Sequence, residues 1–183
     1  SLLIGKEVHG STLGIVGLGR IGKQVARRAK AFDMHVLYHN RRRDPVAEAE
    51  FSAVYRTLDD LLAESDFVAL NCPLPAETTN LISTAQFALM KPSAMLINMS
   101  RGAVVDTDAL YAALRTGRIA GAGIDVTQPE PLPRDHPLLT MQNLVITPHL
   151  GSASDRTRRR MIEMTIANLR AGVAGNPLPY RVG

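Results

Sequence analysis

The sequence predicts an α/β fold in which helices are wound on both faces of a parallel sheet. Three observations lead to this fold: short apolar runs recur along the chain, helical patterns separate them, and a glycine-rich segment joins the first run to the first helical pattern. Runs that do not alternate apolar and polar residues are typical of strands covered on both faces. Strands that alternate with helices favour crossover connections, and therefore a parallel sheet.

Six of the apolar runs predict buried strands, and a seventh run is shorter and weaker. The six runs cover residues 13–16, 35–38, 67–70, 94–97, 122–124 and 144–146, and the weaker run covers residues 53–55. Their lengths suit strands better than helices.

The segments between the runs place apolar residues at helical spacing, so each is expected to bury one face. These faces consist of Ile21, Val25, Ala29 and Phe32 in the first helix, Leu58, Leu61 and Leu62 in a second, and Leu110, Ala113 and Leu114 in a third. Ser83, with Gln86 three residues on, predicts a capping box at the start of another helix. Gly117 stands where the C-terminal cap of the third helix belongs.

The last segment, residues 154–174, predicts one long helix with an apolar stripe. The stripe consists of Ile162, Ile166, Leu169 and Val173. Pro177 and Pro179 follow in extended chain, and the helix serves no obvious strand. We therefore expect residues 1–152 to form one domain, and residues 153–183 to form a helix and tail that pack on something else.

The composition excludes several classes of protein. With 45% hydrophobic and 21% charged residues the chain can bury a core. Cys72 is the only cysteine, which excludes an intrachain disulfide and a multi-thiolate metal site, and we expect no metal. No apolar run approaches the roughly 20 residues of a membrane helix, and residues 1–10 lack the layout of a signal peptide, so we expect a cytoplasmic protein that does not bind membranes. The net charge is +4, but only 4% of residues are aromatic and Trp is absent, which argues against a nucleic-acid partner.

The first motif that indicates a function is Gly17-Leu18-Gly19-Arg20-Ile21-Gly22, which fits G-x-G-x-x-G. In such a motif the first glycine makes a tight turn, the second lets a pyrophosphate approach the backbone, and the third lets the helix pack on the strand. The motif follows a predicted strand and opens a predicted helix, which is the context that dinucleotide binding requires. The alternative is a strand–helix turn that is merely tight.

The end of the second predicted strand bears on which dinucleotide binds. An acidic residue is expected there to bind the ribose hydroxyls, but the chain has Asn40 followed by Arg41, Arg42 and Arg43. Asn can bind a hydroxyl and Arg can bind a phosphate through two nitrogens. We therefore predict a preference for NADP(H), with NAD(H) also accepted. Asp44 could weaken this preference, and the alternative is three solvated arginines.

Three segments of the second half place reactive side chains after predicted strands, at the edge of the sheet where ligands bind. They contribute Arg101, Asp125 with Glu130, and His149. Arg can bind a carboxylate through two hydrogen bonds, a protonated His can donate a proton to a carbonyl oxygen, and Glu can orient the imidazole and favour its charged form. This set suits reduction of a 2-keto acid. The alternatives are a solvated Glu130 and an Arg101 that serves only the fold.

These segments resemble the D-isomer-specific 2-hydroxyacid dehydrogenase family over essentially the whole chain, in GLGRIG, NCPLPAET, INMSRGAVVD, GAGIDVTQPEP and TPHLGS. Within the family they are most similar to glyoxylate/hydroxypyruvate reductases. The resemblance implies a fold of the Rossmann type and the catalytic residues Arg101, Glu130 and His149. It also implies cofactor contacts from Arg20, Ile21, Cys72, Pro73, Thr78, Met99, Ser100, Asp125, Gly151 and Ser152, beside Gly17, Gly19, Gly22, Asn40, Arg41 and Arg42.

The resemblance further implies an activity and partners. We expect NAD(P)H-dependent reduction of glyoxylate, hydroxypyruvate or a related 2-keto acid, in a homodimer formed through the nucleotide-binding domains. Members of the family have a substrate domain before the point at which this sequence begins, and the final helix is expected to pack on it. The family also includes corepressors that respond to nicotinamide nucleotides, so a sensing module without significant turnover is the second hypothesis.

Overall fold

The structure, a computed structural model, describes residues 5–181. The chain divides into two compact units, Ser1–Pro148 and His149–Gly183. Among the described residues, none of the helices has both the length and the apolar character needed to cross a bilayer.

The first unit is built on a seven-stranded sheet in the order β3-β2-β1-β4-β5-β6-β7, and every neighbouring pair is parallel. The strand order reverses between β1 and β4, which are neighbours in the sheet although β2 and β3 separate them in the chain. The predicted α/β fold is confirmed. The strands are β1 (Thr12–Val16), β2 (His35–His39), β3 (Val54–Tyr55), β4 (Phe67–Leu70), β5 (Met95–Asn98), β6 (Gly121–Ile124) and β7 (Leu144–Ile146).

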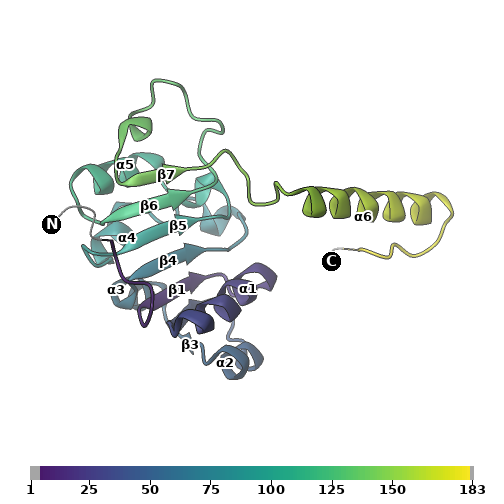
Figure 1. Cartoon of the computed structure of the whole chain (residues 1–183), viewed down its shortest axis with the longest axis horizontal. Coiled ribbons are helices and arrows are strands. Elements are labelled where there is room, and N and C mark those ends of the chain that lie inside the picture. The colour runs from purple at the N-terminus through teal and green to yellow at the C-terminus, as the bar shows by residue number, and fades with distance from the viewer. Residues whose placement is uncertain (1–4, 182–183) are drawn as a thin grey trace. The chain divides into compact units, whose positions relative to one another are not determined.

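Helices cover both faces of this sheet, but unequally (Figure 1). On one face, α3, α4 and α5 bury the larger core over β4, β5 and β6. On the other face, α1 and α2 bury a smaller core over β1 and β2. The helices of this unit are α1 (Arg20–Ala29), α2 (Pro45–Phe51), α3 (Leu58–Glu64), α4 (Thr84–Leu89) and α5 (Thr107–Arg115).

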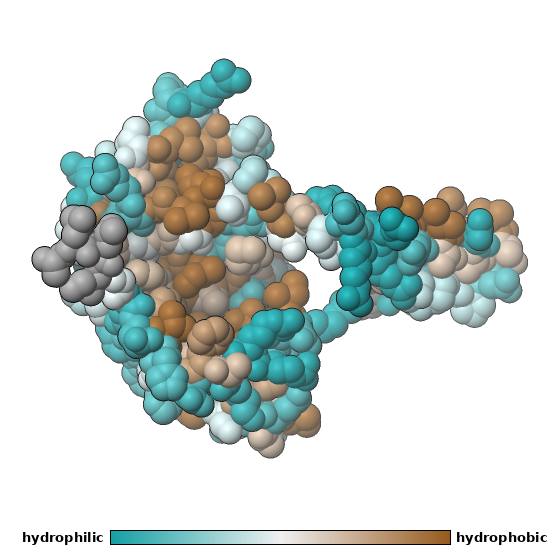
Figure 2. All heavy atoms as spheres, in the orientation of Figure 1, coloured by the Kyte–Doolittle hydropathy of each residue, from teal (hydrophilic) through white to brown (hydrophobic). Residues whose placement is uncertain are grey.

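Part of the second face has no helix over it. Val145 of β7 is 66% exposed, and Met95 and Ile97 of β5 are only partly buried. The register pairs Ile97 with Gly123, and Gly123 with Val145, so these residues share the face. In Figure 1 the strands β5, β6 and β7 lie toward the viewer with no helix in front of them, and Figure 2 shows hydrophobic residues gathered there.

The prediction for the buried face of α1 was right for Val25 and Ala29 but wrong for Ile21 and Phe32, and it made the helix too long. Ile21 is 66% exposed and Phe32 is 52% exposed, whereas the buried residues are Gly22, Ala26 and Ala29. Phe32 lies beyond α1, in the 3₁₀ turn Lys30–Phe32. Small residues on the buried side let α1 approach the sheet closely. The spacing of large apolar residues does not reveal a buried face made of small residues.

The other predicted helices and caps are confirmed, and one helix was not predicted. Ser83 and Gln86 form the capping box of α4, and Gly117 follows α5 with a positive φ of 66°. The helix that was missed is α2, which begins with Asp44 as its N-cap and Pro45 at its first position. Both are ordinary start signals, but only Ala47 and Phe51 of this helix are buried, so its apolar pattern is weak.

An ionic cluster closes the amino edge of the sheet. The Asp66 carboxylate, just before β4, accepts hydrogen bonds from the Thr12 backbone N–H at 3.0 Å, from Lys6 at 3.0 Å and from Lys91 at 3.2 Å. Partial burial alone would raise the pKa of Asp66, but these three donors outweigh burial and lower the pKa to about 2. The cluster thus ties the segment before β1 to the starts of β1 and β5.

The second unit contains α6 (Asp155–Val173), whose N-cap is Ser154. The tail returns along this helix, because Tyr180 and Asn168 exchange two hydrogen bonds, of 2.9 and 3.1 Å. Arg160 also donates to the Tyr180 hydroxyl at 2.9 Å. The predicted long helix is therefore present, and its stripe residues are all exposed, from 42% at Ile166 to 82% at Val173.

Candidate active site

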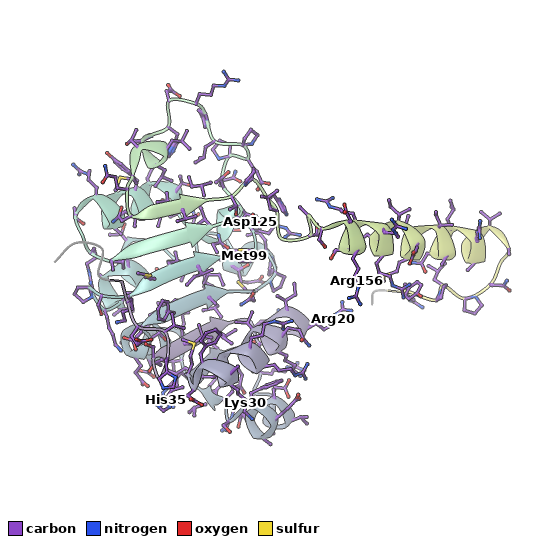
Figure 3. All side chains as sticks on the ribbon, viewed as in Figure 1. Arg20, Lys30, His35, Met99, Asp125 and Arg156 are labelled. Carbon is purple, nitrogen blue, oxygen red and sulfur yellow. The ribbon has the colours of Figure 1, made fainter. Side chains whose placement is uncertain are left out.

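A groove lies in the first unit, at the carboxyl edge of the sheet, and consists of two adjoining recesses. The first recess, of about 810 Å³, extends from the ends of β1 and β2 to the loop after β4. The second, of about 350 Å³, lies between the start of α1 and the ends of β4 and β5. Both are lined by Gly19, Asn71, Cys72 and Pro73, so the two recesses are continuous. Figure 3 places Arg20, Met99 and Asp125 at this edge, and His35 at the opposite edge.

The three glycines of the motif differ in what surrounds them. Gly17 has a φ of 98°, and a Cβ there would lie 2.6 Å from the backbone nitrogen of Cys72. At Gly22 a Cβ would lie 2.3 Å from the Gly17 carbonyl oxygen. At Gly19, however, a Cβ would meet nothing within 4 Å. Gly17 and Gly22 therefore allow close packing, while Gly19 leaves the start of α1 open to the groove, as a bound phosphate requires.

Asn40 holds the glycine loop from the end of β2. Its Oδ1 accepts a hydrogen bond from the Leu18 backbone N–H at 2.8 Å, and the residue also lines the first recess. The side chain predicted to face the ribose thus also fixes the glycine loop, which is predicted to face the phosphates.

The arginines that follow Asn40 divide into two kinds. Arg41 and Arg42 are exposed and line the first recess. Arg43 instead pairs with Glu48 at 2.7 Å. Asp44, which could have weakened anion binding, pairs with Lys23 at 2.6 Å and caps α2. Arg41 and Arg42 form no ion pair among the described residues, although Glu77 lines the same recess.

The loop after β4 provides the outer wall of the first recess. Thr78 shapes it, because its hydroxyl donates to the Pro73 carbonyl at 2.8 Å and also to that of Pro75. Cys72 is free and buried, and burial raises the pKa of its thiol. Its thiol is therefore unsuited to act as a nucleophile.

The second recess contains the predicted carboxylate anchor. Met99, Ser100 and Arg101 follow β5 and line this recess. Asn98 holds their loop: its Oδ1 accepts from the Ser100 N–H at 3.0 Å, and its Nδ2 donates to the Arg101 carbonyl at 3.0 Å. The Arg101 guanidinium is exposed and donates to the Ser100 carbonyl at 2.7 Å.

The loops after β5 and β6 are packed tightly together. A Cβ at Gly102 would overlap the carbonyl oxygen of Thr127. Asp125, at the end of β6, is 4% exposed and accepts a hydrogen bond from the Thr147 hydroxyl at 2.5 Å. Glu130 is exposed, and its Oε2 lies 3.5 Å from the Thr127 backbone nitrogen. Arg101, Asp125 and Glu130 thus come from neighbouring loops at one edge.

The remaining predicted residues belong to the second unit. His149 is its first residue, three positions after the end of β7, with a positive φ of 55°. Gly151 and Ser152 follow in the turn before α6, where the Ala153 N–H donates to the Leu150 carbonyl at 2.9 Å. Of the predicted residues in the first unit, all line the groove except Gly22, Asp125 and Glu130, which line neither recess.

Sequence reasoning missed two asparagines at this edge. Asn98 organises the loop that includes Arg101, and Asn71 lines both recesses. A signal for both was present, because each is a polar residue at the end of an apolar run in the predicted sheet. Within residues 5–181, no group of three His, Cys, Asp or Glu side chains is placed to hold a metal ion.

Comparison with known proteins adds the family to this geometry. Residues 1–151 match the NAD-binding domain of D-isomer-specific 2-hydroxyacid dehydrogenases. The chain belongs to this dehydrogenase family. It is 51% identical over 181 residues to a glyoxylate reductase of Korarchaeum cryptofilum. This match covers 99% of this chain and 54% of the relative. It is 49% identical over 178 residues to the human glyoxylate reductase/hydroxypyruvate reductase. This match covers 97% of this chain and 54% of the human protein.

Solved structures agree with the dehydrogenase assignment. The chain superimposes on a D-lactate dehydrogenase from Lactobacillus jensenii, determined with NAD⁺, with a TM-score of 0.90 and 34% identity. That match covers 99% of this chain and 58% of the other. The chain therefore spans about half the length of the dehydrogenases and reductases that it matches, and this half includes the NAD-binding domain.

Proposed function

We propose that this chain provides the cofactor-binding and catalytic residues of an NADPH-dependent reductase. The substrate would be glyoxylate, hydroxypyruvate or a related 2-keto acid, and the product the D-2-hydroxy acid. The observation that supports this most is the continuous groove, which has Arg41 and Arg42 in one recess and Arg101 in the other. The names of the relatives, which are reductases, favour an enzyme over a sensing module.

The residues present fit a dinucleotide. The open backbone at Gly19 and the start of α1 would hold the pyrophosphate. Arg41 and Arg42 would hold a 2′-phosphate on the adenosine ribose. Met99 and Ser100 would border the nicotinamide half, with Asp125 beside it. When bound, the reduced nicotinamide supplies the hydride that adds to the carbonyl carbon of the substrate.

The protein side of the reaction is assigned to three residues. Arg101 would bind the substrate carboxylate through two charge-assisted hydrogen bonds, which fixes the keto group relative to the cofactor. His149 would donate its proton to the carbonyl oxygen, which becomes the hydroxyl of the product. By the family resemblance, Glu130 would keep the His149 imidazole protonated.

Cofactor titration tests the first step. The 183-residue chain is titrated with NADPH and with NADH at low and high salt. We expect tighter binding of NADPH, with an affinity that falls as salt rises, because the 2′-phosphate would be held by exposed arginines. Failure to bind either nucleotide would contradict the proposal.

Turnover tests the remaining steps. The chain is joined to the part of a curated relative that it does not cover, and glyoxylate-dependent oxidation of NADPH is measured. We expect turnover that a His149→Ala variant loses. Equal turnover in the two proteins would remove His149 from its role, and no turnover in either protein would favour the sensing module.

We also propose that two copies pair through the uncovered face of β5, β6 and β7. Exposed Val145 and partly buried Ile97 support this, because contiguous apolar surface commonly marks an interface. A Cβ at Gly123 would meet nothing within 4 Å, so Gly123→Arg should leave the fold intact and block pairing. Light scattering should give a dimer for the wild type and a monomer for Gly123→Arg. A wild type that stays monomeric at every concentration would contradict the proposed pairing of two copies.

The exposed stripe of α6 is proposed to pack on a substrate-binding domain. Its support is the exposure of four aligned apolar residues, which water disfavours. Limited proteolysis compares the chain alone with the chain joined to the rest of a relative. We expect α6 to be cleaved in the chain alone and protected in the joined protein.

We also propose that the protein is cytoplasmic, because its single free cysteine suits a reducing compartment.

A further inference from the structure

One buried polar atom in the groove has no partner. The Nδ2 of Asn71 is the only buried side-chain nitrogen or oxygen without a hydrogen bond among residues 5–181. Buried polar groups are almost always paired, so this exception calls for an explanation. Asn71 directly follows β4, and its backbone N–H donates to the Val16 carbonyl at 2.8 Å.

The neighbouring strand shows what an asparagine does when it serves the fold. Asn98 ends β5, and the register pairs it with Leu70, the residue before Asn71. Both ends of the Asn98 amide are used, because it accepts from Ser100 and donates to the Arg101 carbonyl. The Asn71 amide makes no such bonds, although it lies one position further at the same edge.

The position of Asn71 indicates what its amide could bind. The residue is half-buried and lines both recesses where they join. The Asn71–Cys72 peptide packs against Gly17, and Gly19 is open beside it. A dinucleotide that occupies both recesses would pass this junction with its pyrophosphate, which is rich in hydrogen-bond acceptors.

Nδ2 is buried, so the side-chain amide would have to turn toward the recess to donate to such an acceptor. The terminal torsion of an Asn side chain is broad and roughly two-fold. A turn about it exchanges the positions of Nδ2 and Oδ1, which have nearly the same size. Nδ2 makes no hydrogen bond in the protein, so this turn breaks no bond of that donor.

We propose that the Asn71 side-chain amide donates a hydrogen bond to the pyrophosphate of the bound dinucleotide. The inference rests on the proposed function, because it requires a dinucleotide in the groove. It adds a binding residue at the point where the strand order reverses, and it gives the unpartnered donor a ligand as its partner.

The first test measures affinity by calorimetry on the 183-residue chain. Asn71→Leu keeps the side-chain size and removes the donor, so NADPH and ADP-ribose should each bind about tenfold more weakly, or about 1.4 kcal/mol. Adenosine 2′-monophosphate, which lacks the pyrophosphate, should bind as before. Asn71→Asp should weaken NADPH more than Asn71→Leu does, because its carboxylate repels phosphate.

The second test is thermal unfolding without ligand. Asn71→Leu should have a Tm equal to or above that of the wild type, because it removes a buried donor that lacks a partner. Asn98→Leu is the matched control and should lower Tm, because three hydrogen bonds are lost. Asn71→Ser replaces Asn71→Leu if the latter does not fold.

Several results would overturn the inference and leave the proposed function standing. Unchanged NADPH affinity in Asn71→Leu is one, and a fall in Tm as large as that of Asn98→Leu is another. Tighter binding by Asn71→Asp than by Asn71→Leu would mean that the amide faces a ribose hydroxyl. Failure of the wild type to bind any nucleotide would instead contradict the proposed function itself.

Discussion

The two edges of the central sheet use polar groups in opposite ways. At the amino edge, Asp66 is surrounded by donors from Lys6, Lys91 and Thr12, and the charges lie on protein partners. At the carboxyl edge, Arg41 and Arg42 line a recess and form no ion pair among the described residues, although Glu77 also lines this recess. The comparison indicates that the first edge stabilises the fold, while the second leaves its charges available for a ligand.

The largest effect is expected from the second recess. Arg101→Ala removes two charge-assisted hydrogen bonds of about 1.5–3 kcal/mol each, so kcat/KM for the keto acid should fall on the order of a thousandfold. The measurement uses the chain joined to the part of a relative that it does not cover. NADPH affinity should not change, because the Arg101 guanidinium is proposed to bind the substrate carboxylate and not the cofactor. An unchanged kcat/KM would show that Arg101 does not bind the substrate carboxylate. The contrast between the two edges of the sheet would then fail for this residue.

A smaller effect is expected from the first recess, where the chain offers a matched control. Arg42→Asp should weaken NADPH by about a hundredfold and leave NADH nearly unaffected, because the 2′-phosphate loses a cation and meets an anion. Arg43→Asp makes the same charge change one residue away, where the side chain pairs with Glu48 and lies 5.8 Å over the Tyr55 ring. It should therefore leave the preference for NADPH in place.

Nucleotide titration of the three proteins decides between the two explanations. Equal loss of NADPH affinity in Arg42→Asp and Arg43→Asp would mean that only the total charge matters. The division of the arginines into two kinds would then have no functional meaning.

The smallest effect is expected at the amino edge. Asp66→Asn should lower the free energy of unfolding at neutral pH by about 1–2 kcal/mol, which discounts the full pKa shift because water still reaches the carboxylate. The folded pKa of about 2 lies below the ordinary value of 3.8. The contribution of Asp66 is therefore present above pH 4 and is lost as pH falls toward 2.

Denaturant unfolding at several pH values checks this result. The wild type should lose this part of its stability in that acid range, while Asp66→Asn should not. NADPH affinity should be the same in both proteins. A fall in affinity in Asp66→Asn would show that the two edges are coupled.

The sequence predicted best those features that depend on local pattern. The apolar runs became strands, and those at the sheet centre are buried because helices cover both faces there, but the run at residues 144–146 was wrongly predicted to be buried, since Val145 is 66% exposed. Ser83 and Gly117 cap helices as their residue types indicate. Ile21 was wrongly placed on the buried face of α1, because it borders the groove instead of the core. Helical spacing cannot show whether an apolar residue faces the core or a groove.

Features that depend on distant partners could not be predicted in this way. That Asn40 holds Leu18, or that Asp44 pairs with Lys23, follows only when β1, β2 and α2 are packed together. The three-way contact of Asp66 likewise joins segments far apart in the chain. For Arg101, Glu130 and His149 the sequence predicts roles, and these remain predictions.

The short stretch between β2 and α2 has an evolutionary consequence. Asn40 is tied to the glycine loop on one side, and Arg43 and Asp44 are tied to α2 on the other. Arg41 and Arg42 lie between these anchors and are exposed, without a hydrogen bond to the described protein. Mutations at these two positions can therefore accumulate at little cost to folding. Cofactor choice should be among the traits that drift most readily between close relatives of this chain.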